Sequence, residues 1–161
     1  MLHSKSACIQ TLNDKFKAQV QKEWQKSPLF DRMKTTYPTA PSNSFLKLMA
    51  QLPRKLTNIL TQLRTGHAPL AKHLHYIKKT DSPLCPACLQ NTESVQHFLL
   101  HCTAHQEARQ RMWHNTGGHN INLSRLFTTA KSLRILFWFI AETGRFHNDL
   151  ELLPYLTQDN P

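Results

Sequence analysis

Three of the four cysteines lie close together, with a histidine between the second and the third. Cys85, Cys88, His97 and Cys102 follow the pattern C-x2-C-x8-H-x4-C. Two cysteines separated by two residues can turn both thiolates toward one point, and the histidine and last cysteine can complete a tetrahedron. Soft thiolates with an imidazole in four-coordinate geometry select zinc. The spacing therefore predicts one structural Zn²⁺ held by these four side chains.

The identity of the fourth ligand stays open between three histidines. His97 fits the usual ligand spacing best, and we prefer it. His105 would give C-x2-C-x13-C-x2-H, which is also chemically reasonable. His101 directly precedes Cys102, which makes a shared site awkward.

Two other readings of the cysteine pair fit the sequence less well. A redox-active C-x-x-C pair normally begins a helix in a thioredoxin-like βαβ unit, and no such pattern surrounds Cys85. A zinc deaminase would need H-x-E upstream of P-C-x-x-C. Here the upstream segment is His73-Leu74-His75, and Leu84 takes the place of that proline. A metal site remains the best interpretation.

The elements that must position the site show helical periodicity. We expect helices over the segments with apolar residues at three- and four-residue spacing: 12–24, 44–50, 53–65, 69–77, 92–101, 107–113 and 132–143. Only 4 glycines occur, which disfavours a β-rich fold with many tight turns. The prediction is an all-α fold with an irregular Cys3His zinc knuckle between helices. The expected organisation is an N-terminal helix and linker (1–44), a zinc-knuckle helical domain (45–146) and a flexible tail (147–161).

Charge is distributed unevenly, and this points to a polyanionic partner. The formal net charge is +10, and residues 1–80 hold 14 of the 20 Lys and Arg residues against 3 acidic residues. Such asymmetry is typical of proteins that bind RNA or DNA. The candidate residues for contacting phosphates or stacking on bases are Arg54, Lys55, Arg64, His67, Lys72, His73, Tyr76, Lys78 and Lys79.

Several functional classes are disfavoured. A polymerase or nuclease would need clustered carboxylates for two metal ions, but the ten acidic residues are scattered apart from Asp149 and Glu151. Without a glycine-rich phosphate loop, we expect no enzyme and no small-molecule substrate. No 18-residue apolar run predicts a membrane span, and residues 1–15 lack a secretory h-region. An intracellular location follows as an expectation, with nucleus and cytoplasm both open.

The segment LPRKLTNILTQLRTGHAPLAKHLHYIKKTDSPLCPACLQNTESVQHFLLHC resembles the zinc-binding C-terminal region of fungal non-LTR (LINE-type) retrotransposon reverse transcriptase polyproteins. In that family a QLRTGH helix end leads into a knuckle with the pattern C..C…E…H.L..C, followed by an arginine. The residues that match outside the metal ligands are Gln62 to His67, Pro69, Leu70, Glu93, Leu99 and Arg109. The segments Trp24 to Ser27 and Ile140 to Phe146 extend the similarity to about residues 10–146.

The resemblance implies a zinc-binding, nucleic-acid-associated module that follows reverse transcriptase and RNase H domains, and it favours His97 as the ligand. The chain contains neither catalytic domain. An alternative hypothesis is a protein-interaction module that docks on polymerase or RNase H domains through two apolar surfaces, the stripe Leu12, Phe16, Val20 and Trp24 and the run from Leu133 to Ile140. A second alternative is a remnant of an element without a function of its own.

Overall fold

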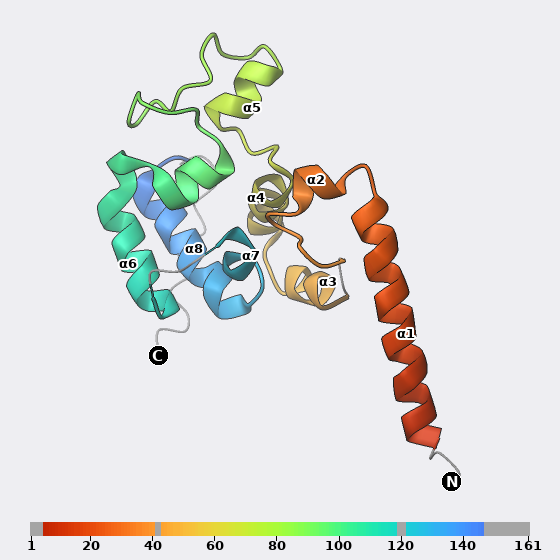
Figure 1. Cartoon of the computed structure of the whole chain (residues 1–161). Helices are drawn as coiled ribbons and strands as arrows, with labels where there is room; N and C mark the ends of the chain where they lie inside the picture. Colours follow the sequence, from red (N-terminus) through yellow and green to blue (C-terminus); the bar gives the residue numbers. More distant parts are fainter. Residues whose placement is uncertain (1–4, 41–42, 119–121, 147–161) are drawn as a thin grey trace. The chain divides into compact units, whose positions relative to one another are not determined.

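The computed structural model describes residues 5–40, 43–118 and 122–146 (Figure 1). Within these ranges the chain is all-helical and contains no strand, which confirms the predicted fold class; a single antiparallel bridge joins Leu84 to Thr92. The helices are α1 (Lys5–Lys26), α2 (Phe30–Met33), α3 (Asn43–Ala50), α4 (Arg54–Thr65), α5 (Ala71–Tyr76), η1 (His97–His101), η2 (Thr103–His105), α6 (Gln106–Thr116), α7 (Leu123–Leu126) and α8 (Ala130–Thr143).

Contacts along the chain separate two units, residues 1–43 and residues 44–161. From the sequence we expected a boundary after residue 44, next to the observed division. The tail expected at residues 147–161 lies outside the described residues.

The first unit contains α1 and α2. The expected helix over residues 12–24 is present within α1, but none of its residues is buried. Near its end, the indole Nε1 of Trp24 donates to the carbonyl oxygen of Tyr37 at 3.0 Å, and the indole meets the ring of Phe30 edge to face. Residues 31–44 were expected to be an extended linker, and this prediction is wrong at its start. There, α2 forms because local backbone hydrogen bonds, such as Lys34 N–H to Phe30 O at 2.7 Å, close a helical turn.

The hydrophobic core of the second unit is built on α4, η1, α6, α7 and α8. The predicted inward face of α4 is buried as expected: Leu56, Ile59, Leu60 and Leu63. Helix α6 lies alongside α8 (Figure 1). The ring of Phe98 in η1 sits among them, 5.5 Å from that of Phe139 and 6.0 Å from that of Phe146. Burying such a side chain contributes about 1.5–3 kcal/mol, so η1 is anchored firmly.

Helix α8 confirms the helix predicted over residues 132–143, a segment that is apolar nearly all round and was therefore expected to be buried. At its start, Thr129 and Ser132 form a reciprocal capping box. Its end is Gly144, whose φ of 64° is the left-handed conformation that glycine adopts without a steric cost. Leu133, Leu136, Phe137, Phe139 and Ile140 are buried in the core, so the suggestion that this run is a docking surface is wrong for these five residues. These side chains of α8 therefore belong to the hydrophobic core.

Candidate metal centre

The first two cysteines are presented by a tight knuckle at residues 84–92. The bridge between Leu84 and Thr92 closes its base, and the Cys85 N–H donates to Asn91 O at 2.8 Å. The Leu89 N–H donates back to Cys85 O at 2.8 Å, with Leu89 in the left-handed region at φ 56°. This backbone path turns the side chains of Cys85 and Cys88 toward the same side, as the C-x2-C spacing predicts.

The other two candidate ligands come from η1, a turn with a π-helical hydrogen bond. The Cys102 N–H donates to His97 O, five residues earlier, at 2.7 Å. Along a regular α-helix, five residues would leave the two side chains about 140° apart. The wider turn brings His97 and Cys102 back onto one face. Wide turns of this kind are often found at functional sites.

The start of this turn differs from the sequence-based prediction. We expected Thr92 to cap an α-helix that extends to His101. Instead Thr92 belongs to the knuckle bridge, and the Ser94 hydroxyl accepts a hydrogen bond from the His97 N–H at 3.0 Å. Thr92 is held in the bridge by the hydrogen bonds on either side of it, from the Cys85 N–H to Asn91 O at 2.8 Å and from the Glu93 N–H to Pro83 O at 2.9 Å, so the helical turn starts after it.

The four side chains converge into a compact group. Their ligand atoms, the three Sγ atoms and one imidazole nitrogen, all lie within 4.8 Å of one another. The Cys85 and Cys102 Sγ atoms are 3.7 Å apart, and Cys88 Sγ lies 3.4 Å from His97 Nε2. A zinc tetrahedron with ordinary bond lengths has edges of about 3.8 Å between two sulfurs and about 3.6 Å between sulfur and nitrogen. The group has the donor types and dimensions to hold a metal ion.

Electrostatics at the group are set by burial and by backbone amides. The backbone N–H of Gln90 lowers the pKa of Cys88 from its ordinary value, and the amide of Asn91 adds to this effect. Burial raises the pKa of Cys102 to about 11, against a hydrogen bond from the Ala104 amide. Burial also lowers the pKa of His97, which favours the neutral imidazole that metals bind. A bound cation would therefore offset the cost of holding the buried thiolate of Cys102.

Of the three candidate histidines, only His97 lies with the cysteines. His101 is exposed. The ring of His105 packs edge-on against Phe98 at 5.6 Å and Phe139 at 6.4 Å, with a buried Nε2. Burial lowers the pKa of His105, which keeps its ring neutral among these aromatic side chains.

A buried carboxylate connects the knuckle to the rest of the domain. Glu93 is fully buried, and its two carboxylate oxygens accept from Arg145 Nε at 2.7 Å and from its guanidinium NH₂ at 2.8 Å. The Ala71 N–H at the start of α5 donates to the same carboxylate at 2.5 Å. Hydrogen bonding to Glu93 raises the pKa of Arg145. One side chain thereby joins the knuckle, α5 and the segment after α8.

A second arginine supports the end of η1. Arg109 is buried, and its guanidinium donates to Leu99 O at 3.2 Å and to Cys102 O at 2.5 Å. These bonds tie α6 to the end of η1, where the Cys102 carbonyl also accepts from the His105 N–H at 3.3 Å. Glu93 and Arg109 stood in the sequence only as matches to a family pattern. For Glu93, the sequence signal for a structural role was its position between the cysteine pair and the histidine, in a chain with only 10 acidic residues.

The knuckle tip gives a first prediction, at Leu89. A left-handed backbone costs a non-glycine residue about 1–2 kcal/mol, and this side chain is 72% exposed, so little burial offsets the cost. We expect Leu89→Gly to raise the free energy of unfolding by about 0.5–1 kcal/mol, after the extra entropy of glycine in the unfolded chain. Thermal unfolding with saturating zinc measures this change. Leu84→Gly, in the bridge, is the control and should lower the free energy of unfolding. If Leu89→Gly and Leu84→Gly changed this free energy in the same direction, the left-handed backbone of Leu89 would not explain the result.

The predicted nucleic-acid contacts do not form one set. Arg54 and Lys55 are exposed at the start of α4, while His67 and the α5 residues follow its end, about 18 Å along the helix axis. Around α5 the exposed members are Lys72, Tyr76, Lys78 and Lys79. His73 is half-buried, and its ring meets His67 edge to face at 5.1 Å.

Arg64 corrects the sequence-based assignment. It was expected on the polar face of α4, but it is only 8% exposed. Its guanidinium lies 3.3 Å from the ring centroid of Phe45 and donates to the carbonyl oxygen of Phe127 at 3.3 Å. The apolar stem and planar head of arginine suit this buried position, where it joins α3 to the segment after α7. The apolar spacing of residues 69–77 also led us to expect Ile77 to face inward, and this expectation is wrong because the side chain, directly after α5, is 44% exposed.

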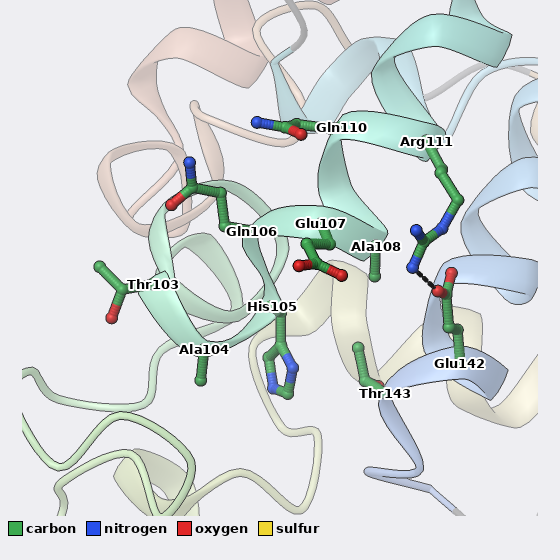
Figure 2. A pocket seen from close by; sticks show the side chains of 10 residues that line it. All are labelled: Thr103, Ala104, His105, Gln106, Glu107, Ala108, Gln110, Arg111, Glu142 and Thr143. Carbon is green, nitrogen blue, oxygen red and sulfur yellow. Dashed lines mark hydrogen bonds and ion pairs between the residues drawn. The ribbon is translucent and has the colours of Figure 1, made fainter.

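A separate hollow of about 610 Å³ lies beside the start of α6 (Figure 2). Its lining includes His105, Glu107, Gln110 and Thr143, and an ion pair between Arg111 and Glu142 borders it. None of the four candidate metal ligands lines it. The hollow and the metal group are therefore distinct sites.

No helix in the described ranges is long and apolar enough to cross a membrane. Comparison of the chain with protein-family models, with curated proteins and with solved structures finds no match.

Proposed function

We propose that this protein is a structural zinc-binding module, derived from a retrotransposon reverse transcriptase polyprotein, that binds nucleic acid without catalysing a reaction. The Cys3His group carries the proposal. Three thiolates and an imidazole at these distances suit zinc, and four protein ligands leave no open coordination position for a substrate. Such a site stabilises a fold and does not perform chemistry.

The position of the group in the fold supports a structural role. Of the residues in η1, His97 faces the cysteines while Phe98 and Leu99 are buried in the core. Metal binding and core packing thus order the same turn. Binding of structural zinc contributes on the order of 10 kcal/mol to folding in small zinc domains.

Nucleic-acid binding is supported by the net charge of +10 and by the cations that remain exposed in the second unit. Of the sequence candidates these are Arg54, Lys55, Lys72, Lys78 and Lys79. Origin from a retrotransposon is supported by the motif alone. The buried positions of Glu93 and Arg109 give two of the motif residues a physical role in holding the knuckle.

A second candidate function is docking on a protein, such as the polymerase or RNase H domain of a parent element. The specific observation is the apolar side of α1, where Leu12 is 61% and Phe16 is 70% exposed. Exposed apolar groups at helical spacing are typical of a helix that packs against a partner.

Salt-dependent binding tests the first function. We expect the zinc-loaded protein to bind fluorescein-labelled RNA or DNA, with log K falling linearly against log salt. The slope is about −0.7 per contacted phosphate on single strands, because each contact releases condensed counterions. Fluorescence anisotropy from low to physiological salt measures it. Absence of binding at low salt, or an affinity that salt does not change, would contradict nucleic-acid binding and leave docking through α1 as the better candidate.

A further inference from the structure

The end of α5 has an unusual residue in its termination motif. The Lys79 N–H donates to Leu74 O at 2.8 Å and the Lys78 N–H to His75 O at 3.0 Å, the paired bonds of a Schellman motif. This motif needs a left-handed residue, and Lys78 adopts it with φ 58°. Glycine normally occupies this position because a Cβ atom makes the conformation costly.

Elsewhere in the described part of the chain, glycine holds this position. Helices α4, α6 and α8 end at Gly66, Gly117 and Gly144, all with positive φ. Only α5 ends with a lysine in the left-handed region among the described residues. A glycine would adopt this backbone conformation without the steric cost of a Cβ atom, and a binding role for the exposed side chain explains why a lysine stands here.

An exposed aromatic ring lies two residues before this lysine, at the last residue of α5. Tyr76 is 82% exposed, the most exposed of the large apolar side chains in the described ranges. Lys72 is four residues earlier on α5, and side chains at this spacing are neighbours on a helix surface. Lys79 follows and is also exposed. The end of α5 therefore presents a flat ring among three cations.

We propose that Lys72, Tyr76, Lys78 and Lys79 form a subsite for single-stranded nucleic acid. A base stacks on the phenol ring of Tyr76, and the lysines contact the flanking phosphates. The charge of the three lysines complements a polyanion, and every base has a face that stacks on an aromatic ring. Duplex bases are already stacked on each other and do not expose that face, so the ring selects single strands. This inference rests on the proposed nucleic-acid function and names its substrate class.

Two of the histidines close to this subsite, His67 and His73, are less suited to stacking. His67 and His73 meet edge to face at 5.1 Å, and His73 is half-buried. Their contact occupies part of each ring. Tyr76, at 82% exposed, offers its ring to a base.

Binding of fluorescein-labelled oligo(U) of 15 nucleotides and of a blunt 15-base-pair duplex tests the subsite, on the full-length zinc-loaded protein. We expect Tyr76→Ala to weaken oligo(U) binding by about 10-fold, since one base stack is lost, and Tyr76→Phe to bind like the wild type. Duplex affinity should change less than twofold. Lys78→Gly keeps the backbone conformation, and it should reduce the magnitude of the salt slope on oligo(U) by about 0.7. Lys131→Gln, an exposed lysine on α8, is the control for loss of one charge and should leave the slope unchanged.

The outcomes separate this inference from the broader proposal. If the wild type binds neither probe, the nucleic-acid function itself fails. If the wild type binds oligo(U) but Tyr76→Ala binds it equally well, the subsite is wrong and the broader function stands. If Tyr76→Ala weakens both probes to the same extent, selection of single strands is wrong. Circular dichroism of each variant, matching the wild type, confirms that a change in binding does not come from unfolding.

Discussion

Cys102→Ser is expected to abolish stoichiometric zinc binding and to unfold the knuckle together with η1. The serine hydroxyl is a poor zinc ligand, and a three-ligand site loses much of the binding free energy, which for structural zinc is on the order of 10 kcal/mol. Cys102 is fully buried and its Sγ lies 3.7 Å from that of Cys85, so the change opens one corner of the tetrahedron. Native mass spectrometry should show one zinc per wild-type chain and none in the variant. Far-ultraviolet circular dichroism should show a loss of helical signal.

Cys8 provides the matched control, because it is an exposed cysteine on α1 and not part of the group. Cys8→Ser should keep one zinc and full helicity. His97→Ala should lose the metal like Cys102→Ser, whereas His101→Ala and His105→Ala should retain it. Zinc retention in His97→Ala with loss in His105→Ala would move the fourth ligand to His105. A wild-type protein without zinc would remove the metal site altogether.

The same site predicts a dependence on pH. Zinc binds thiolates, so protons compete with the metal, and zinc affinity falls as the pH falls. Burial raises the pKa of Cys102 to about 11 in the metal-free fold, so this cysteine must give up a proton when the metal binds near neutral pH. Zinc-dependent stability should therefore be lost on acidification and regained when the pH is restored.

Glu93→Gln is expected to lower the free energy of unfolding by about 3 kcal/mol, because removing one partner of a buried ion pair leaves the other charge uncompensated. The carboxylate is fully buried, and the side chain of Arg145 is 26% exposed. The change also weakens the bond from the Ala71 N–H that joins α5 to the knuckle. Urea unfolding at saturating zinc measures the loss.

Glu107→Gln is the control for this change, since Glu107 is an exposed glutamate on α6. Surface substitutions of this kind usually change stability by no more than about 0.5 kcal/mol. The double variant Glu93→Gln with Arg145→Met should lose less stability than the sum of the single variants, because no unpaired charge remains. A Glu93→Gln protein as stable as the Glu107→Gln control would show that this ion pair does not hold the knuckle to the domain.

Whereas the short helices α2 and α7 and the π-helical turn η1 were not predicted, the longer helices and the composition of the metal group were determined by the sequence itself. Local physics was sufficient there: the four-residue spacing of Leu56, Leu60 and their neighbours predicts the buried face of α4, and Gly66 predicts its end. The C-x2-C and H-x4-C spacings name the same four residues that converge in the structure. The chemistry of thiolate and imidazole does not depend on the path that the chain takes between them.

Only the tertiary structure decided between the histidines. Spacing favours His97 but leaves His105 and His101 open, whereas in the structure the hydrogen bond from the Cys102 N–H to His97 O, five residues earlier, places the His97 imidazole with the cysteines. The aromatic rings of Phe98 and Phe139 hold His105 elsewhere. The hydrogen bond that closes this short turn therefore selects His97 as the ligand, and no residue pattern strongly encodes such a turn.

Long-range pairing also lay beyond the sequence. Glu93 and Arg145 are 52 residues apart, and Arg64 and Phe127 are 63 residues apart. By its charge, Arg64 is expected at the surface, yet the domain buries it because Phe45 and the Phe127 carbonyl supply an aromatic face and an acceptor. Charge and periodicity predict which residues prefer water. Tertiary packing decides which of these polar residues are nevertheless buried, because it supplies the hydrogen-bond acceptors and aromatic faces that replace water.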